Sequence, residues 1–210
     1  MTTAFLFPGQ GSQFVGMGKD IANASPAAKK VYEQANTILN ANLSALCWDG
    51  PEADLNDTYN TQPALYVCSM ATLAAIREKK NVNPTFVAGH SLGEVTALAA
   101  AGALSFEDGL KLVRERGRLM KRAGELSPGG MAAILNVEAN VLTEVCAEAS
   151  SVTGKVVQVA NDNCPGQIVI SGDNMALEKA MELAKAKGAK RALKLPVSIA
   201  ANSPLMNVVV

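Results

Sequence analysis

The clearest chemical signal is the stretch Gly89-His90-Ser91-Leu92-Gly93, which holds a serine close to two glycines. Residues 84–88 before it favour a short buried strand, and residues 94–101 after it are rich in helix formers. A serine at a sharp strand-to-helix turn is typical of a nucleophile elbow, in which glycines remove the Cβ atoms that would block the strained backbone. The alternative is an ordinary βα turn. The elbow predicts an exposed Ser91 hydroxyl above the N-terminus of a helix, where an oxyanion would be stabilised.

A second signal is an arginine on the apolar side of a later predicted helix, residues 107–123. At 100° per residue from Leu110, Arg116 falls near 240°, among apolar residues that span about 180° to 340° (Leu112, Val113, Gly117, Leu119 and Met120). A buried guanidinium keeps its charge and needs an anionic partner. The pattern leaves two alternatives open, a structural ion pair with Asp or Glu and a clamp for a substrate carboxylate. The opposite face is interpreted as solvated surface (Lys111, Arg114, Glu115, Arg118, Lys121 and Arg122).

Composition excludes several classes of function. Lys+Arg and Asp+Glu are 19 each, so no net charge favours nucleic acid or an anionic membrane. No apolar run reaches the length of a membrane span, and the N-terminus lacks the basic region of a signal peptide. His90 is the only histidine and the four cysteines form no C-x-x-C pair, so a histidine-based zinc site is excluded and no metal is expected. We expect reduced thiols and a cytoplasmic location.

The elements that would position these residues begin with a strand at Ala4–Phe7 and a glycine-rich loop at residues 8–13. This loop matches neither the Walker nor the dinucleotide-binding pattern, so a tight connection and a ligand-approaching loop remain alternatives. Ser25 and Pro26 predict the start of a helix that runs to about Leu39. Residues 50–60 are expected to form a polar turn region with solvated carboxylates (Glu52, Asp54 and Asp57).

Two further helix starts are indicated. Thr61-Gln62-Pro63 predicts a helix to about Lys80, with the proline just inside its start, and Ser105 with Asp108 resembles a capping box.

Residues 127–196 show a different pattern, β-α-β-β-α-β, which predicts a ferredoxin-like lobe. The expected strands are residues 131–136, 155–160, 167–171 and 190–195, the helices are 138–150 and 174–187, and a loop covers 161–166. A basic edge is interpreted as either a solvated face or a surface for an acidic partner (Lys187, Lys190, Arg191 and Lys194). Ser203-Pro204 then indicates another helix start.

Several motifs, in order and with similar spacing, resemble the malonyl-CoA:acyl carrier protein transacylase family. They are residues 7–13, 61–64, 89–93, 116–117 and 161–172. The resemblance implies an α/β fold: an α/β-hydrolase-like large subdomain with a parallel sheet, formed by residues 1–126 and 197–210 and incomplete at the C-terminus, and an inserted ferredoxin-like small subdomain at residues 127–196.

The resemblance also implies an activity, the transfer of malonyl from coenzyme A to the phosphopantetheine thiol of acyl carrier protein, which feeds fatty acid or polyketide synthesis without a cofactor. By the same likeness Ser91 is the acylated nucleophile, the backbone N–H groups of Leu92 and Gln10 form the oxyanion hole, and Arg116 pairs with the malonyl carboxylate. This favours the clamp interpretation of Arg116. Three further residues are implied in substrate binding (Gln62, Met120 and His90).

The sequence departs from this family in two ways. Asn202 stands where the family has its catalytic histidine, and an amide cannot accept a proton at neutral pH. His90 is a poor substitute because adjacent side chains on a sharp turn point apart. Family chains also continue past position 210. We therefore expect slow or absent turnover. We also expect the large subdomain to expose an apolar face or a sheet edge, with marginal stability or oligomerisation as the result, whereas a complete family member is expected to be a monomer.

Two alternatives to the transacylase stay open. One is a non-catalytic protein that binds acyl carrier protein or acyl-CoA, and the other is a serine thioesterase or esterase. Arg116 argues against the second alternative, because a clamp for a free carboxylate suits a dicarboxylic acyl group.

Overall fold

The computed structural model describes residues 2–210, which divide into two compact units. The chain passes from the first unit to the second between Arg118 and Leu119, within helix α7 (Phe106–Leu126). Each unit has its own hydrophobic core. None of the helices within residues 2–210 is long and apolar enough to cross a bilayer.

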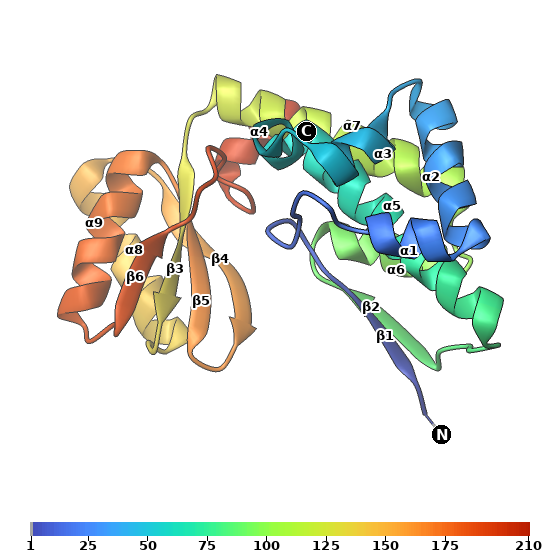
Figure 1. The fold of residues 1–210 in the computed structure, drawn as a ribbon. Coiled ribbons are helices and arrows are strands. Elements are labelled where there is room, and N and C mark those ends of the chain that lie inside the picture. Colours follow the sequence, from blue (N-terminus) through green and yellow to red (C-terminus); the bar gives the residue numbers. More distant parts are fainter. Residues whose placement is uncertain (1) are drawn as a thin grey trace. The chain divides into compact units, whose positions relative to one another are not determined.

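The first unit contains the parallel strand pair β1 (Ala4–Phe7) and β2 (Phe86–Gly89), seen side by side in Figure 1. Phe7 is in register with Gly89, and the His90 N–H donates to the Phe7 carbonyl at 3.0 Å. Because the strands are parallel, their carboxyl ends lie at one edge. The loop that follows Phe7 and the turn at Ser91 are therefore neighbours.

Helices make up most of the rest of this unit: α1 (Lys19–Ala24), α2 (Pro26–Leu39), α3 (Leu43–Asp49), α4 (Glu52–Asn56), α5 (Thr58–Lys79) and α6 (Leu92–Ala100). Tyr32 and Tyr66 are the largest fully buried side chains in this unit, and their ring centres lie 5.1 Å from that of Trp48 and 5.6 Å from that of Phe106, respectively. The Tyr66 hydroxyl also donates to the Phe106 carbonyl at 3.1 Å, which joins α5 to the start of α7.

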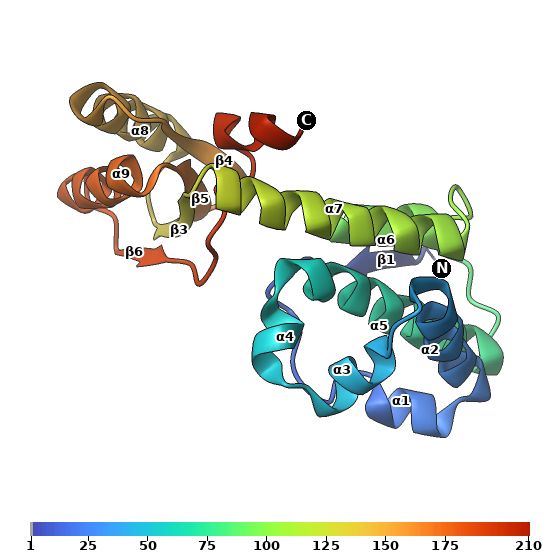
Figure 2. The same cartoon turned by 90° about the horizontal axis from the view of Figure 1, so that it is seen from above.

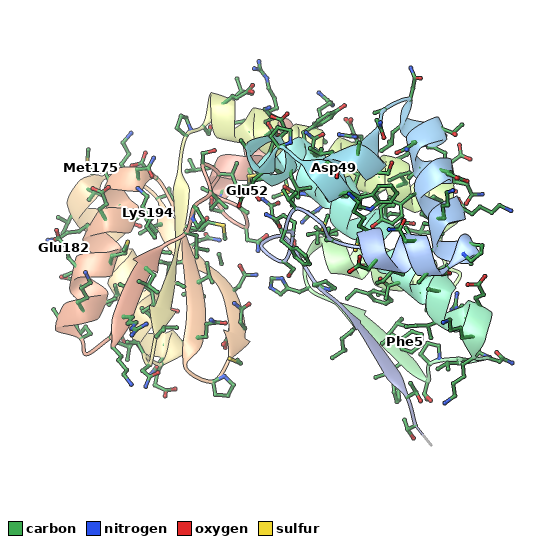
Figure 3. All side chains as sticks on the ribbon, viewed as in Figure 1. Phe5, Asp49, Glu52, Met175, Glu182 and Lys194 are labelled. Atoms are coloured by element: carbon green, nitrogen blue, oxygen red, sulfur yellow. The ribbon has the colours of Figure 1, made fainter. Side chains whose placement is uncertain are left out.

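The prediction of a polar turn region at residues 50–60 is wrong, because α4 and the first turn of α5 occupy it. The Asp57 carboxylate accepts from the Tyr59 N–H at 3.0 Å and so caps α5, which begins at Thr58, three residues before the predicted start at Thr61. Pro63 consequently lies inside the helix. Glu52, labelled in Figure 3, and Asp54 are exposed as expected, whereas Asp57 is partly buried. Helices α1 and α3 were not predicted from the sequence either.

The second unit contains β3 (Gly130–Leu135), α8 (Ala139–Thr153), β4 (Val157–Cys164), β5 (Gln167–Gly172), α9 (Asn174–Ala186) and β6 (Arg191–Lys194). Its antiparallel sheet has the order β4-β5-β3-β6, and α8 and α9 lie side by side against it (Figures 1 and 2). This confirms the predicted ferredoxin-like pattern. The predicted loop at residues 161–166 is mostly strand, because β4 continues through two register irregularities to a tight turn at Pro165-Gly166.

The C-terminal segment also contacts this second unit. The Ser203 hydroxyl accepts from the Leu205 N–H at 3.3 Å and caps a 3₁₀ helix, η1 (Pro204–Val209). The Asn202 carbonyl accepts from Gln158 Nε2 at 2.9 Å. The assignment of residues 197–210 to the large subdomain stays a prediction.

The basic edge of the second unit is exposed, and Lys194 lies 3.6 Å from the Glu178 carboxylate (Lys194 is labelled in Figure 3). An exposed and partly paired edge favours the solvated-face interpretation of these basic residues.

Candidate active site

Ser91 lies at a strained strand-to-helix turn. Its φ of 56° and ψ of −113° place a non-glycine residue in a sparsely populated region, as observed at functional turns. A Cβ added to Gly89 would overlap the Gly93 carbonyl, and one added to Gly93 would overlap the Phe7 carbonyl oxygen. Only glycine allows this close crossing of backbones, and Ser91 itself is exposed. The predicted elbow geometry is confirmed, and the ordinary turn is wrong.

Backbone N–H groups lie beside this serine. Leu92 is the first residue of α6, so its N–H has no acceptor within the helix. The next two N–H groups, of Gly93 and Glu94, bond the carbonyls of His90 and Ser91. The loop after β1 packs against the same turn, since a Cβ added to Gly9 would lie 2.6 Å from the His90 carbonyl oxygen. The oxyanion-hole roles of Leu92 and Gln10 stay predictions.

The Arg116 guanidinium contacts the serine. Its Nη2 donates to Ser91 Oγ at 2.9 Å, and its Nη1 donates to Gln62 Oε1 at 2.8 Å. Gln62 is fully buried in α5. Burial lowers the pKa of Arg116, and the nearby Glu94 carboxylate opposes this shift. Both hydrogen-bond acceptors are neutral oxygens, so in residues 2–210 no hydrogen-bonded carboxylate neutralises this cation. This arrangement favours the clamp over the structural ion pair.

The residues that helix α7 buries are not the set that the sequence pattern predicted. Its buried positions in the first unit are Gly109, Leu110, Val113 and Gly117, whereas Leu112 is 47% exposed. The apolar stripe is narrower than predicted, because α7 contacts α5 through two glycines: Cβ atoms there would collide with the Tyr66 hydroxyl and the Thr58 carbonyl. Arg116 therefore lies at the edge of the stripe, not in its middle.

The interpretation of Arg114 as solvated surface is also wrong. This side chain is partly buried, and its Nη1 donates to the Tyr59 carbonyl and to Asn60 Oδ1, both at 2.9 Å. Burial lowers its pKa. The signal for this contact was Pro63, because a proline inside a helix leaves the carbonyl of the fourth residue before it without a donor.

Thr58 is a second residue that sequence reasoning missed. Its hydroxyl accepts from Gln10 Nε2 at 3.1 Å, which ties the loop after β1 to the first turn of α5. The two residues lie 48 positions apart in the chain, and the local sequence carries no signal of this contact.

The other predicted site residues are placed as follows. His90 is exposed, and a Cβ added to Gly9 would lie 2.7 Å from its Nδ1. Met120 follows Arg116 by one turn of α7 and is partly buried. Asn202 has a φ of 57°, which asparagine tolerates, and its Nδ2 contacts the Ala160 carbonyl and Asn161 Oδ1 at 3.4 Å each. Met120 and Asn202 belong to the second unit, and their roles at Ser91 stay predictions.

An apolar pocket of about 410 Å³ lies along β1, lined among others by Leu6, Phe14 and Ile76. Neither Ser91 nor Arg116 lines it, so we place the candidate chemistry at the elbow and not in this pocket.

Comparison with known proteins agrees with this geometry. The family profile described as the acyl transferase domain matches residues 4–210. The chain belongs to the acyl transferase domain family. It is 51% identical over 203 residues to the malonyl CoA-acyl carrier protein transacylase of Bacillus subtilis, an alignment that covers 97% of this chain and 63% of that protein. The chain thus spans just under two thirds of that relative's length.

Solved structures give the same result. An acyl carrier protein S-malonyltransferase from Vibrio cholerae is 43% identical, with a TM-score of 0.93 over 100% of this chain and 68% of its own. A malonyl-transacylase in complex with a type II PKS acyl-carrier protein is 41% identical, with a TM-score of 0.93 over 98% of this chain and 66% of its own. These similarities extend through both units.

Proposed function

We propose that this chain carries the malonyl-transfer chemistry of its relatives, from malonyl-CoA to acyl carrier protein through an ester on Ser91. The observation that carries the proposal is the contact of Arg116 Nη2 with Ser91 Oγ at 2.9 Å, at the strained turn of the elbow. A hydroxyl nucleophile beside a guanidinium whose hydrogen-bond acceptors are both neutral matches a substrate that has a thioester carbonyl and a free carboxylate.

In the first half-reaction, Ser91 Oγ attacks the thioester carbonyl, and the N–H groups of Leu92 and Gln10 stabilise the resulting oxyanion. The C–S bond then breaks, coenzyme A leaves as its thiol, and Ser91 carries a malonyl ester. In the second half-reaction, the phosphopantetheine thiol of acyl carrier protein attacks this ester and Ser91 regains its proton. Each half-reaction moves one proton between Ser91 and a thiol.

Arg116 gives the reaction its preference for malonyl. In the free protein its two Nη groups are held by Ser91 and Gln62. A bound malonyl carboxylate would replace neutral acceptors with a charged one, in a site where burial already disfavours the unpaired cation. His90, Gln62 and Met120 are proposed to complete the substrate site.

The reaction also needs a group that accepts the Ser91 proton, and the histidine that has this role in the family is replaced here. Asn202 at the family's histidine position cannot remove the Ser91 proton, which costs roughly 10²–10⁴ in rate. We therefore propose slow acylation.

The names of the relatives and the solved complex with an acyl-carrier protein support acyl carrier protein as the partner. Fatty acid or polyketide synthesis and a cytoplasmic location belong to the same proposal, as does chemistry without a cofactor.

Intact mass spectrometry after incubation with malonyl-CoA tests this function. We expect a malonyl adduct that is absent from Ser91→Ala and reduced in Arg116→Ala, and an acylation rate raised about 10²-fold by Asn202→His. Binding without an adduct in any variant would favour the non-catalytic alternative. Hydrolysis of neutral esters that Arg116→Ala leaves unchanged would favour the thioesterase.

A further inference from the structure

In the first turn of α5, one backbone carbonyl has no donor within the helix, and a side chain of α7 supplies a donor instead. Pro63 has no N–H, so the Tyr59 carbonyl lacks its donor within the helix. Arg114 of α7 supplies a donor from outside, because its Nη1 lies 2.9 Å from this carbonyl. The same Nη1 lies 2.9 Å from Asn60 Oδ1, and the guanidinium carbon lies 4.0 Å from the centre of the Tyr59 ring.

This first turn also touches the two other parts of the candidate site. Thr58 Oγ1 accepts from Gln10 Nε2 at 3.1 Å, and Gln62 Oε1 accepts from Arg116 Nη1 at 2.8 Å. The backbones are close as well, since a Cβ added to Gly117 would lie 2.6 Å from the Thr58 carbonyl oxygen. Gln62 directly follows this turn in α5, so a shift of the turn would move the backbone that carries Gln62 Oε1.

We propose that Arg114 is a positioning residue for the carboxylate clamp. It fastens the first turn of α5 to α7, Gln62 then holds one Nη of Arg116, and the other Nη is directed at Ser91. Arg114 and Arg116 lie two residues apart on α7. They donate hydrogen bonds to Tyr59 and Gln62, which lie three residues apart on α5. The inference rests on the proposed function, because it assigns Arg116 to the malonyl carboxylate.

This role predicts a loss that depends on the acyl group. Arg114 contacts Tyr59 and Asn60 and acts on the site through Gln62 and Arg116. Loosening the clamp lowers acylation by malonyl-CoA and leaves acylation by acetyl-CoA almost unchanged, because acetyl has no free carboxylate. For Arg114→Ala in the full chain we expect the malonyl-to-acetyl ratio of acylation rates to fall about tenfold, within the range that small misplacements cause.

Two variants sharpen the test. Arg118→Ala is the matched control, because Arg118 lies one turn further along α7, is exposed and pairs with Glu115. Its ratio should stay within about twofold of wild type. Arg114→Lys retains a charged donor and should recover part of the loss. An equal loss with both acyl-CoAs, or a loss matched by Arg118→Ala, overturns the proposal.

A double-mutant cycle tests whether Arg114 replaces the donor that Pro63 lacks. Pro63→Ala restores an N–H four residues after Tyr59, so Arg114→Ala should cost severalfold less in that background than in wild type. Strictly additive effects on the malonyl-to-acetyl ratio contradict the inference. This comparison also keeps the proposal falsifiable where Arg114→Ala alone folds poorly.

A spectroscopic readout separates this inference from the proposed function. In arginine-¹⁵N-labelled protein, the Arg116 side-chain N–H signal, assigned by its loss in Arg116→Lys, should be sharp in wild type and in Arg118→Ala. It should broaden or shift toward the free-arginine position in Arg114→Ala. Absence of malonylation in wild type with this response intact refutes the proposed function alone. An unchanged Arg116 signal in Arg114→Ala refutes the positioning role.

Discussion

At the scale of single residues, Ser91 shows how the backbone presents a hydroxyl. Its positive φ costs roughly 1–3 kcal/mol, which the surrounding structure must offset. The offset comes from the close crossing of the elbow: Gly93 meets the carbonyl of Phe7, and the His90 N–H bonds the same carbonyl. The local strain and the packing of β1 against β2 are therefore coupled.

Gly93→Ala should accordingly be severely destabilising. Its Cβ would overlap the Phe7 carbonyl oxygen, a backbone atom of a paired strand, so relief requires moving the strand. We expect a loss of about 3 kcal/mol or more in the free energy of unfolding by urea. Gly102→Ala is the control for a glycine replaced without a clash: a Cβ there would meet open space, so its cost is limited to the roughly 1–2 kcal/mol of a left-handed backbone, which Gly93 does not have. Similar losses in the two variants would contradict this explanation.

At the scale of elements, one side chain of the first unit both caps a helix and links it to a second helix. Ser25 caps α2, since its Oγ accepts from the Ala28 N–H at 3.1 Å. The same hydroxyl donates to Glu78 Oε2 of α5 at 2.6 Å, and Ser25 is 2% exposed. The helix start that the sequence indicates is therefore also a link between two helices.

Ser25→Ala removes both contacts and should lower the free energy of unfolding by about 1–2 kcal/mol. Ser25→Thr keeps a hydroxyl and should recover most of the loss. Thermal unfolding followed by circular dichroism compares the two variants. A loss in Ser25→Thr as large as in Ser25→Ala would show that burial of the residue, and not its hydrogen bonds, is decisive.

At the scale of the whole molecule, the first unit exposes an apolar strand. Within residues 2–210, β1 pairs only with β2, and residues 4–7 carry no charge. Leu6 is 78% exposed and Phe86 is 64% exposed, and Phe5 is labelled on β1 in Figure 3. An uncharged strand edge beside an apolar surface favours association with another chain.

We therefore expect the isolated chain to self-associate with increasing concentration, as measured by sedimentation velocity. Leu6→Lys should weaken this association by at least about tenfold, because a charge on an edge strand opposes strand pairing. Val152→Lys places the same charge on an exposed apolar position of α8 and serves as the control. A chain that stays monomeric at every concentration, or equal effects of the two variants, would contradict this expectation.

Local signals of the sequence predicted much of this fold. The elbow at Ser91, the caps at Ser25 and Ser203, and the βαββαβ order each depend on residues within a few positions of one another. The misses have a different origin. Helices α1 and α3 are short, and their apolar residues are buried against other helices, as Leu43 and Cys47 are. Short helices depend on tertiary packing more than on propensity.

In the candidate site, too, some features follow from the local sequence and others depend on tertiary contacts. The sequence by itself determined the strained serine, because glycines at both ends of a five-residue turn are a local requirement, and it singled out Arg116 as a cation on a mostly apolar face. Only the tertiary structure decided that Gln62 and Ser91 are its acceptors, and that Arg114 repairs the carbonyl left open by Pro63. The physical reason is that these contacts join residues 25 to 55 positions apart. Such hydrogen bonds exist only after helix packing has brought α5, α6 and α7 together.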